Sequence, residues 1–375
     1  MVIGFDAKRA AQNGTGLGNY SRFVIGAMFN HRPGDDYCLY VPSPRRNRYL
    51  TTLPSNARIV SPSGIWRRLP SLWRSAAMSA DIMRDGVELF HGLSNELPLD
   101  ILKARGTRSI VTVHDLIFLR HPSYYKPIDR RIYDFKFRRA CVNADRVIAV
   151  SECTKRDIMS CYGIDGGKID VVYQGCDKAF SQVLPDAVKA DVARRYALPP
   201  RFVLYVGSIE ERKNLLLLAQ AMRFARHPFR VVAVGRRTPY ADKVSAWLER
   251  NGLADRVTML HSVSFADLPA IYQLADVFVY PSRYEGFGIP LLEALCSGVP
   301  AIGATGSCLE EAGGSGSVYV NPDDPKELAW QLDRLLDDDE ARHAMVAMGK
   351  SHAARFTEER LIADLLRTYD KVINT

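Results

Sequence analysis

Two glutamates bracket a glycine-containing segment in the second half of the chain. Residues 280–298 read Tyr-Pro-Ser-Arg-Tyr-Glu-Gly-Phe-Gly-Ile-Pro-Leu-Leu-Glu-Ala-Leu-Cys-Ser-Gly, with the acids at Glu285 and Glu293. The apolar run Val277–Tyr280 predicts a buried strand, and Pro290 suits the first turn of a helix. Loops at the carboxyl ends of parallel strands bind ligands. The two carboxylates are therefore candidates to accept hydrogen bonds from the vicinal hydroxyls of a sugar.

The glycines of this segment allow a ligand to approach the backbone closely. Gly286 and Gly288 flank Phe287, and the free N–H groups at the start of the predicted helix favour an anion. Gly298 is placed to end that helix, as the residue after a C-cap does. The alternative is a plain turn with one capping and one solvated glutamate. The coincidence of glycines, proline and both acids favours a binding loop.

A basic pair follows a second junction of strand and glycine. Residues 205–214 read Tyr-Val-Gly-Ser-Ile-Glu-Glu-Arg-Lys-Asn, so that Arg212 and Lys213 come shortly after Gly207 and Ser208. An arginine offers a planar fork to phosphate oxygens, and a lysine adds a compact positive charge. The alternative is that the Lys-Arg pair is simply exposed on the surface, as such pairs often are. Its position just past the first strand of a second domain favours phosphate binding.

Together these segments resemble the motifs of the family-4 (group 1) retaining nucleotide-sugar glycosyltransferases. The glutamate pair is similar to their E-x7-E signature, and the basic segment is similar to their donor-phosphate segment. Residues 111–116, Val-Thr-Val-His-Asp-Leu, and residues 16–20, Gly-Leu-Gly-Asn-Tyr, extend the resemblance over nearly the whole chain. Residues 308–311 read Cys-Leu-Glu-Glu where relatives commonly have Ser-Leu-Pro-Glu, so no role is assigned to Glu311.

The resemblance implies an α/β protein with the GT-B fold, in which two Rossmann-like, doubly wound parallel-sheet domains face a cleft. It implies transfer of a hexose from a nucleoside diphosphate, with retention, to a glycan or lipid-diphosphate-linked acceptor. The run of motifs is most similar to mannosyltransferases of bacterial surface polysaccharide synthesis. GDP-mannose is thus the first candidate donor, with UDP-glucose and UDP-N-acetylglucosamine as alternatives. From another class, a non-catalytic nucleotide- or nucleic-acid-binding module stays open.

The resemblance also implies roles for single residues. Arg212 and Lys213 would stabilise the departing diphosphate, Glu285 would contact the transferred sugar, and Glu293 the ribose. His114 is expected in the active site, with no general-base role assigned to it. The predicted catalytic residues are His114, Arg212, Lys213 and Glu285, and the predicted donor-binding residues are Gly16, Gly207, Ser208, Arg212, Lys213, Glu285, Gly286, Phe287, Gly288 and Glu293.

No metal or other cofactor is expected. The acidic run at residues 337–340, Asp-Asp-Asp-Glu, contains a formal D-x-D, but it lies between helical patterns, as a solvated helix start does. The sequence contains no P-loop, no H-E-x-x-H and no nucleophile elbow. Neither half contains the full dinucleotide-binding fingerprint, in which a G-x-G-x-x-G loop is followed by an acidic residue that binds the ribose. This absence disfavours an NAD-dependent oxidoreductase.

The rest of the chain supplies the elements that must position these residues. Short Val- and Ile-rich runs alternate with helical patterns, which indicates parallel sheets buried on both faces. Pro199-Pro200 precedes a fresh strand, so the predicted domains are residues 1–180 and 181–356, followed by a C-terminal helix, 357–375, that the resemblance places on the first domain. The predicted strands are Val2–Asp6, Cys38–Val41, Leu89–His91, Ser109–His114, Val147–Ser151, Ile169–Val172, Phe202–Val206, Arg230–Val234, Val257–Leu260, Val277–Tyr280, Pro300–Gly303 and Val318–Val320.

The two halves differ in charge. The 375 residues include 50 Lys plus Arg and 42 Asp plus Glu, which gives +8; residues 1–180 hold 27 basic and 17 acidic side chains and residues 181–375 hold 23 and 25. Basic residues mixed with aromatic ones favour an anionic membrane surface or acceptor, and no nucleic-acid motif is present, so nucleic acid is not an expected partner. The alternative is a solvated face over core aromatics. The candidate surface consists of Trp66, Arg67, Arg68, Trp73, Arg130 and Arg131.

Composition limits the class and compartment. Hydrophobic residues make up 47% and charged residues 25%, which excludes collagen-like and disordered chains. The seven cysteines form no Cys-x-x-Cys motif, the start lacks a signal-peptide core, and no apolar stretch is long enough to span a membrane. We therefore expect a cytoplasmic protein. The basic first half of the chain adds the expectation that the protein associates peripherally with the inner face of the cytoplasmic membrane.

Overall fold

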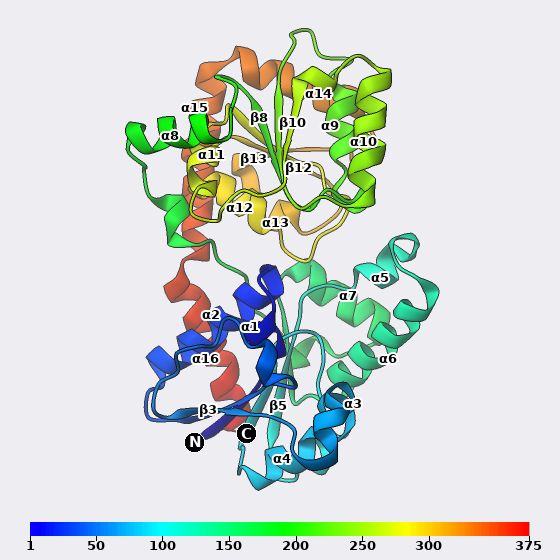
Figure 1. Cartoon of the computed structure of the whole chain (residues 1–375), viewed down its shortest axis with the longest axis vertical. Coiled ribbons are helices and arrows are strands. Elements are labelled where there is room, and N and C mark those ends of the chain that lie inside the picture. Colours follow the sequence, from blue (N-terminus) through cyan, green and yellow to red (C-terminus); the bar gives the residue numbers. More distant parts are fainter. Residues whose placement is uncertain (375) are drawn as a thin grey trace. The chain divides into compact units, whose positions relative to one another are not determined.

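The chain forms two compact units, described in a computed structural model over residues 1–374. The first unit comprises residues 1–174 and 359–374, and the second comprises residues 175–358. Each unit is a parallel sheet with helices on both faces (Figure 1). The chain passes between the units at 174/175 and 358/359, whereas the sequence placed its boundaries at 180/181 and 356/357.

The first unit is built on a seven-stranded sheet in the order β3-β2-β1-β4-β5-β6-β7. Its strands are β1 (Val2–Asp6), β2 (Asp36–Tyr40), β3 (Ala57–Val60), β4 (Leu89–Gly92), β5 (Arg108–Val113), β6 (Arg146–Ala149) and β7 (Ile169–Val171). Its helices are α1 (Lys8–Gln12), α2 (Gly16–His31), α3 (Pro70–Ala76), α4 (Met78–Arg84), α5 (Ile117–Arg120), α6 (Pro127–Asn143), α7 (Glu152–Tyr162) and most of α16 (Glu358–Ile373).

The second unit is built on a six-stranded sheet in the order β10-β9-β8-β11-β12-β13. Its strands are β8 (Val203–Val206), β9 (Val231–Val234), β10 (Val257–Leu260), β11 (Val277–Tyr280), β12 (Ala301–Ala304) and β13 (Ser317–Val320). Its helices are α8 (Asp186–Arg195), α9 (Leu215–Ala221), α10 (Pro239–Arg250), α11 (Leu268–Leu274), α12 (Ile289–Cys296), α13 (Leu309–Gly313), α14 (Pro325–Asp337) and α15 (Asp339–Ala353).

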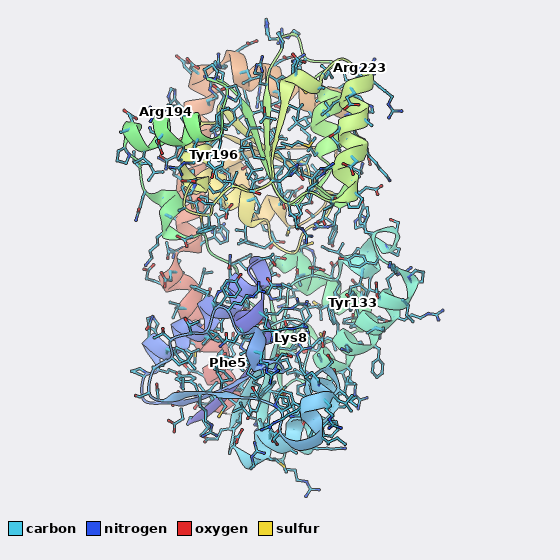
Figure 2. All side chains as sticks on the ribbon, in the orientation of Figure 1. Phe5, Lys8, Tyr133, Arg194, Tyr196 and Arg223 are labelled. Carbon is cyan, nitrogen blue, oxygen red and sulfur yellow. The ribbon has the colours of Figure 1, made fainter. Side chains whose placement is uncertain are left out.

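The strands of the first sheet are apolar on both faces because each face supports a separate core. Along β4, Leu89 packs into the core that also holds α2 and α16 side chains, whereas its neighbour Phe90 packs into the core under α3 to α7. This alternation follows from the two-residue period of a strand. Phe5 on β1 is fully buried among these side chains (Figure 2).

The last helix, α16, packs in the core of the first unit. Leu365, Tyr369 and Val372 are buried there at helical spacing. The Tyr369 hydroxyl lies 2.6 Å from Nδ1 of His91 on β4, which is itself fully buried. This polar contact fixes the helix against the sheet.

Each of the twelve predicted strands overlaps an observed one, and one strand was missed. β3 is a short edge strand, and only Val60 of its four residues is buried. An edge strand of this kind lacks the continuous apolar run by which the other strands were predicted. The stop at Gly298 is confirmed, since this residue follows α12 with φ +73° and the next N–H, of Val299, donates to Ala294 O.

Both sheets reverse their strand order at one point. In the first unit, chain order runs outward from β1 to β3 on one side and from β4 to β7 on the other. In the second unit, the same reversal lies between β8 and β11. Ligands of doubly wound sheets bind at the carboxyl ends of the strands beside such a switch point, which makes these two places the candidate sites of the two units.

Candidate active site

The switch point of the second unit brings together the two segments predicted to bind the donor. β8 and β11 are paired neighbours, and the loops that follow them carry Arg212 and Lys213 on one side and Glu285 on the other. The backbone confirms that the loops touch, because Arg283 N–H donates to the carbonyl of Arg212 at 2.9 Å.

The Glu285 carboxylate is the centre of this cluster. Its Oε1 accepts hydrogen bonds from the hydroxyls of Tyr280 (2.7 Å) and Ser282 (2.8 Å), and it lies 2.7 Å from Nη1 of Arg212 and 3.6 Å from Nζ of Lys213. Burial by itself raises the pKa of such a carboxyl, but the two cations and the two hydroxyls outweigh it and lower the pKa of Glu285 to about 2. Glu285 is therefore a fixed negative charge.

Arg212 and Lys213 are held in place by further contacts. Nη2 of Arg212 lies 2.9 Å from Oε1 of Glu210, and Nη1 donates to the Tyr284 carbonyl. Nζ of Lys213 donates to the Tyr280 hydroxyl at 2.8 Å. Both side chains are mostly buried, with 14% and 15% of their surface exposed. Arg212 and Lys213 are thus two preorganised cations of the kind that suits phosphate oxygens, and the carboxylates of Glu210 and Glu285 balance their charge in the free protein.

Gly207 makes room for the lysine of this pair. A Cβ at position 207 would lie 3.0 Å from Cδ and 3.3 Å from Nζ of Lys213, and the backbone there has φ +155°. A larger residue would push the ammonium group away from the strand end. The neighbouring Ser208 is part-buried, and its carbonyl accepts the hydroxyl of Tyr205 at 3.4 Å.

Glu293 lies on α12 in a very different setting. Its side chain is buried, and Oε2 accepts a hydrogen bond from the Tyr272 hydroxyl at 2.9 Å. Burial raises the pKa of Glu293 to about 8, with nearby Cys296 and Asp177 adding to the rise while Tyr272 and Lys213 oppose it. Two glutamates with pKa values pushed in opposite directions commonly mark separate functional roles.

The loop between the two glutamates is supported from inside. The Cys308 thiol donates to the carbonyls of Glu285 (3.0 Å) and Phe287 (2.8 Å). The Phe287 ring is buried and packs against Phe356, with ring centroids 5.4 Å apart. The side chain of Phe287 thus supports the loop from inside.

His114 follows β5 in the first unit, and both of its ring nitrogens are engaged. One, Nε2, lies 3.0 Å from the Leu93 carbonyl, so it carries the proton and donates. The other, Nδ1, then accepts from Nε2 of Gln174 at 3.1 Å. Burial lowers the pKa of His114 to about 4, with the Leu93 contact opposing and Arg9 adding to the fall. The imidazole is neutral and positioned by its neighbours, which disfavours proton abstraction.

Two glycines of the predicted loop in the first unit, Gly16 and Gly18, have different surroundings. Gly16, the predicted donor contact, is exposed at the start of α2, and nothing lies within 4 Å of a Cβ built there. At Gly18, by contrast, a Cβ would lie 1.8 Å from the Asn13 carbonyl oxygen. Packing requires glycine at position 18, whereas position 16 is open to a ligand.

The predicted basic surface needs one correction. Trp73 is fully buried, and its Nε1–H donates to Asp81 at 2.6 Å, so it belongs to the core and not to a surface. It was assigned by composition, and its burial on α3 was not visible in the local pattern. Arg67 and Arg68 are exposed, as is Arg131, whereas Trp66 and Arg130 are part-buried.

Four side chains of the site were not predicted. Tyr280 and Ser282 follow β11 and both bind Glu285; their hydroxyls directly after a strand end were a usable signal. Cys308 departs from the family pattern yet still donates to the loop. Tyr272 lies 21 residues before its partner Glu293, and no local motif marks it.

Residues 1–374 contain neither a cluster of metal ligands nor a membrane-spanning helix. In that range no three His, Cys, Asp or Glu side chains are gathered as a metal site would need. The helices described over the same residues include none that combines the length and apolar character of a membrane span.

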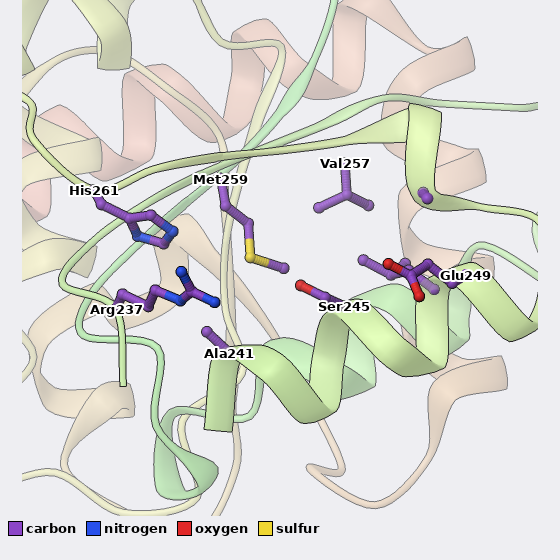
Figure 3. Close-up of a pocket in the computed structure, with 9 residues that line it drawn as sticks. Arg237, Ala241, Ser245, Glu249, Val257, Met259 and His261 are labelled. Carbon is purple, nitrogen blue, oxygen red and sulfur yellow. The ribbon is translucent and has the colours of Figure 1, made fainter. Parts of the chain in front are cut away.

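A cavity of about 330 Å³ lies elsewhere in the second unit, between α10 and β10 (Figure 3). Arg237 and His261 stand at one end, Glu249 at the other, and Met259 points between them (Figure 3). None of the predicted donor-binding residues lines it. The switch point, and not this cavity, carries the clustered charges described above.

Two doubly wound parallel sheets, with a carboxylate and two cations at the switch point of the second, are the architecture of GT-B proteins. Sucrose-phosphate synthase from Thermosynechococcus elongatus superimposes with a TM-score of 0.81 over 100% of this chain and 99% of its own, at 21% identity. Anabaena HepE in complex with UDP gives a TM-score of 0.77 over 99% of each chain, at 18% identity. This likeness shows the GT-B fold.

Sequence comparison supplies the family. The family described as "Glycosyl transferases group 1" matches residues 192–352, and "Glycosyltransferase Family 4" matches residues 31–180. The chain therefore contains a group 1 and a family-4 glycosyltransferase domain and is a glycosyltransferase.

Two curated relatives are O-antigen enzymes. O-antigen chain mannosyltransferase B of Escherichia coli is 28% identical over 75% of this chain and 74% of its own length. O-antigen chain mannosyltransferase RfbU of Salmonella typhimurium is 32% identical over 59% of this chain and 58% of its own length. Since the second match spans little more than half of that relative, the particular activity of this chain is a matter for proposal.

Proposed function

We propose that this glycosyltransferase moves a hexose from a nucleoside diphosphate, with retention at the anomeric carbon, to a glycan or lipid-diphosphate-linked acceptor of bacterial surface polysaccharide. One observation carries the proposal: Glu285, Arg212 and Lys213 form a buried cluster at the switch point of the second unit. A carboxylate accepts sugar hydroxyls, while the two cations suit the diphosphate beside the sugar.

The residues divide the work in the following way. Arg212 and Lys213 stabilise the negative charge that grows on the diphosphate as the glycosidic bond breaks. Glu285 orients the transferred sugar, and Glu293 binds the ribose. The acceptor attacks from the face that the diphosphate leaves, and the leaving phosphate takes the acceptor's proton. His114 has a positioning role, because both of its nitrogens are already engaged.

The donor proposed first is GDP-mannose. The motifs favour this donor, and two curated relatives are named O-antigen mannosyltransferases. UDP-glucose is the principal alternative, because the structurally similar HepE was solved with UDP and glucose. UDP-N-acetylglucosamine is the third candidate. Assays with each donor in turn would identify the nucleotide base and the sugar that the enzyme uses.

Peripheral membrane association forms part of the proposal. Beside exposed Arg67 and Arg68, the side chains of Ile65, Leu69 and Leu72 are also exposed. Helix α6 repeats the arrangement with Ile128, Ile132 and Phe135 around Arg131. Exposed apolar side chains interleaved with arginines are typical of segments that lie on an anionic bilayer.

The experiment compares turnover of the candidate donors and then determines the anomeric configuration of the product. The purified chain is incubated with GDP-mannose, UDP-glucose and UDP-N-acetylglucosamine, and release of the nucleoside diphosphate is measured with and without added lipid-linked acceptor. One donor should be turned over selectively. NMR of the product should show the anomeric configuration of the donor retained. Inversion would contradict the mechanism, and turnover of none of the three donors would contradict the donor assignment.

A further inference from the structure

The switch point of the first unit carries charged residues that the mechanism above does not use. It lies between β1 and β4, where Lys8 and Arg9 follow the end of β1. Lys8 is labelled in the first unit in Figure 2. By the same topological rule that locates the donor loops in the second unit, this edge of the sheet is a place for a ligand.

A buried ionic cluster begins at Asp6, whose Oδ1 accepts the backbone N–H of Lys8 at 3.3 Å. Arg74, with 8% of its side chain exposed, donates through Nε to Asp6 Oδ2 at 2.8 Å and through Nη1 to Glu96 Oε2 at 2.9 Å. Nζ of Lys136 lies 3.3 Å from the same oxygen of Glu96. The two carboxylates of the cluster are thus already paired with cations, and one of these, Arg74, is close enough to Lys8 to act on its pKa.

The side chains of Lys8 and Arg9 form no direct ion pair of this kind. Among residues 1–374, neither side chain has a carboxylate within ion-pair distance or a hydrogen-bond partner, although both are only part-exposed. The pKa of the Lys8 ammonium is lowered, first by burial and then by the charges of Arg74 and Arg9, while the charges of Asp6 and Glu96 oppose the fall. Four cations and two carboxylates give this group of six side chains a net charge of +2, which favours the arrival of an anion.

We infer that Lys8 and Arg9 form a phosphate-binding subsite at the carboxyl end of β1, with Asp6, Arg74 and Glu96 as the positioning residues beneath it. A phosphate group accepts hydrogen bonds from both an ammonium and a guanidinium group, and it neutralises the excess charge. Arg9 also lies close enough to His114 to lower the pKa of the imidazole. The charge of Arg9 is therefore felt at the predicted active-site histidine.

The inference deepens the proposed function, because the first unit is the expected acceptor side. The phosphate has two chemical sources: a phosphate group on the acceptor or the diphosphate of the donor. Both have the oxygen geometry that the two cations would bind. The two sources differ in how they bind relative to a nucleotide. An acceptor phosphate binds at the same time as a separate nucleotide, whereas the donor's diphosphate belongs to the nucleotide itself.

The test measures inorganic phosphate binding to the full chain by calorimetry, alone and in the presence of a saturating nucleoside diphosphate. The variants are Lys8→Ala, Arg9→Ala and the double substitution. The matched control is Lys103→Ala, which changes an exposed lysine of the same unit. Chemical unfolding of each variant verifies that the fold is kept.

If the anion belongs to the acceptor, phosphate binds on top of the nucleotide, and each substitution weakens this binding about tenfold because a charge-assisted hydrogen bond is lost. If it belongs to the donor, phosphate no longer binds once nucleotide is present, and nucleotide affinity itself falls by a similar factor. Unchanged affinity for both ligands in the double variant would overturn the subsite. A chain that binds phosphate here but binds no nucleoside diphosphate would instead overturn the proposed function alone.

Discussion

Arg212 and Glu285 form a buried ion pair at the switch point of the second sheet, with Nη1 2.7 Å from Oε1. The two residues come from loops after different strands, so the pair exists only when β8 and β11 are neighbours. Lys213 stands 3.6 Å from the same oxygen. The pair keeps one carboxylate ionised for sugar hydroxyls, and Lys213 adds a second preorganised cation for the proposed diphosphate.

Replacement of Lys213 by alanine is expected to lower turnover by about two orders of magnitude, because a preorganised charge aimed at the leaving group is lost. Steady-state release of nucleoside diphosphate measures the effect. The exposed Lys243 on α10 provides the matched control, since Lys243→Ala removes the same charge away from the switch point. Near-normal turnover in Lys213→Ala would contradict the phosphate role.

The Glu285→Gln variant is expected to lose stability in a pH-dependent way. The pKa of Glu285 is lowered from 4.5 to about 2, which corresponds to about 3 kcal/mol of unfolding free energy at neutral pH. This contribution is present above pH 4.5 and is lost as the pH falls from 4.5 toward 2. Urea unfolding of the variant and the parent should therefore differ at pH 7 and converge in acid.

The exposed Glu249 supplies the control for that experiment, because Glu249→Gln should leave unfolding close to the parent at every pH. A difference between Glu285→Gln and the parent that stays constant from pH 7 into acid would show that lost packing, and not lost charge, causes the destabilisation.

Nucleotide affinity is expected to rise with pH through Glu293. The pKa of this carboxyl is raised to about 8, so the free protein holds it protonated at neutral pH. An ionised carboxylate accepts hydrogen bonds from two ribose hydroxyls more strongly than the protonated group does. Affinity should therefore increase about tenfold per pH unit as the pH approaches 8, with release of a proton on binding. Calorimetry in buffers of different ionisation enthalpy measures both.

Glu293→Gln should abolish this proton release; if release persists, another group is responsible. The same raised pKa affects stability with the opposite sign to Glu285. The stabilisation is fully present below pH 4.5 and is lost as the pH rises through about 8. The glutamine variant should thus gain stability relative to the parent on the alkaline side.

Tyr272→Phe is expected to raise the pKa of Glu293 further, because the Tyr272 hydroxyl donates to the carboxylate and lowers that pKa. Nucleotide affinity at neutral pH should fall several-fold, and the pH dependence should move to a higher midpoint. Tyr319→Phe removes a hydroxyl that donates to Gly314 O instead, and it should move neither. An unmoved midpoint in Tyr272→Phe would exclude this tyrosine as a positioning residue for Glu293.

Binding to anionic vesicles is expected to be salt-sensitive and to depend on the first unit. Changing Trp66, Arg67 and Arg68 together to alanine should weaken co-sedimentation, since each arginine near the surface contributes about 1 kcal/mol. Exposed Arg194 and Arg223 of the second unit (Figure 2) provide the control pair. Retained affinity in the triple variant, or equal loss in the control, would remove this surface from the proposal.

Sequence alone determined the class of fold and most of the elements. Apolar runs such as Val277–Tyr280 predict buried parallel strands because both faces of such a strand need apolar side chains. The motifs around Glu285 and Lys213 were also visible, since chain-local spacing defines them. The missed strand β3 and the misplaced Trp73 show the limit: an edge strand has a weak apolar signal, and burial of one tryptophan depends on what packs over it.

Only the tertiary structure decided which charged side chains are in contact and which protonation state each one has. Glu285 and Glu293 are the same residue type in one motif, yet contact with Arg212 and Lys213 lowers one pKa to about 2, while burial beside Tyr272 raises the other to about 8. The partners lie far from their glutamates in sequence, so no local pattern contains them. Electrostatic energy depends on distance and burial in three dimensions, and only the folded strand order sets those.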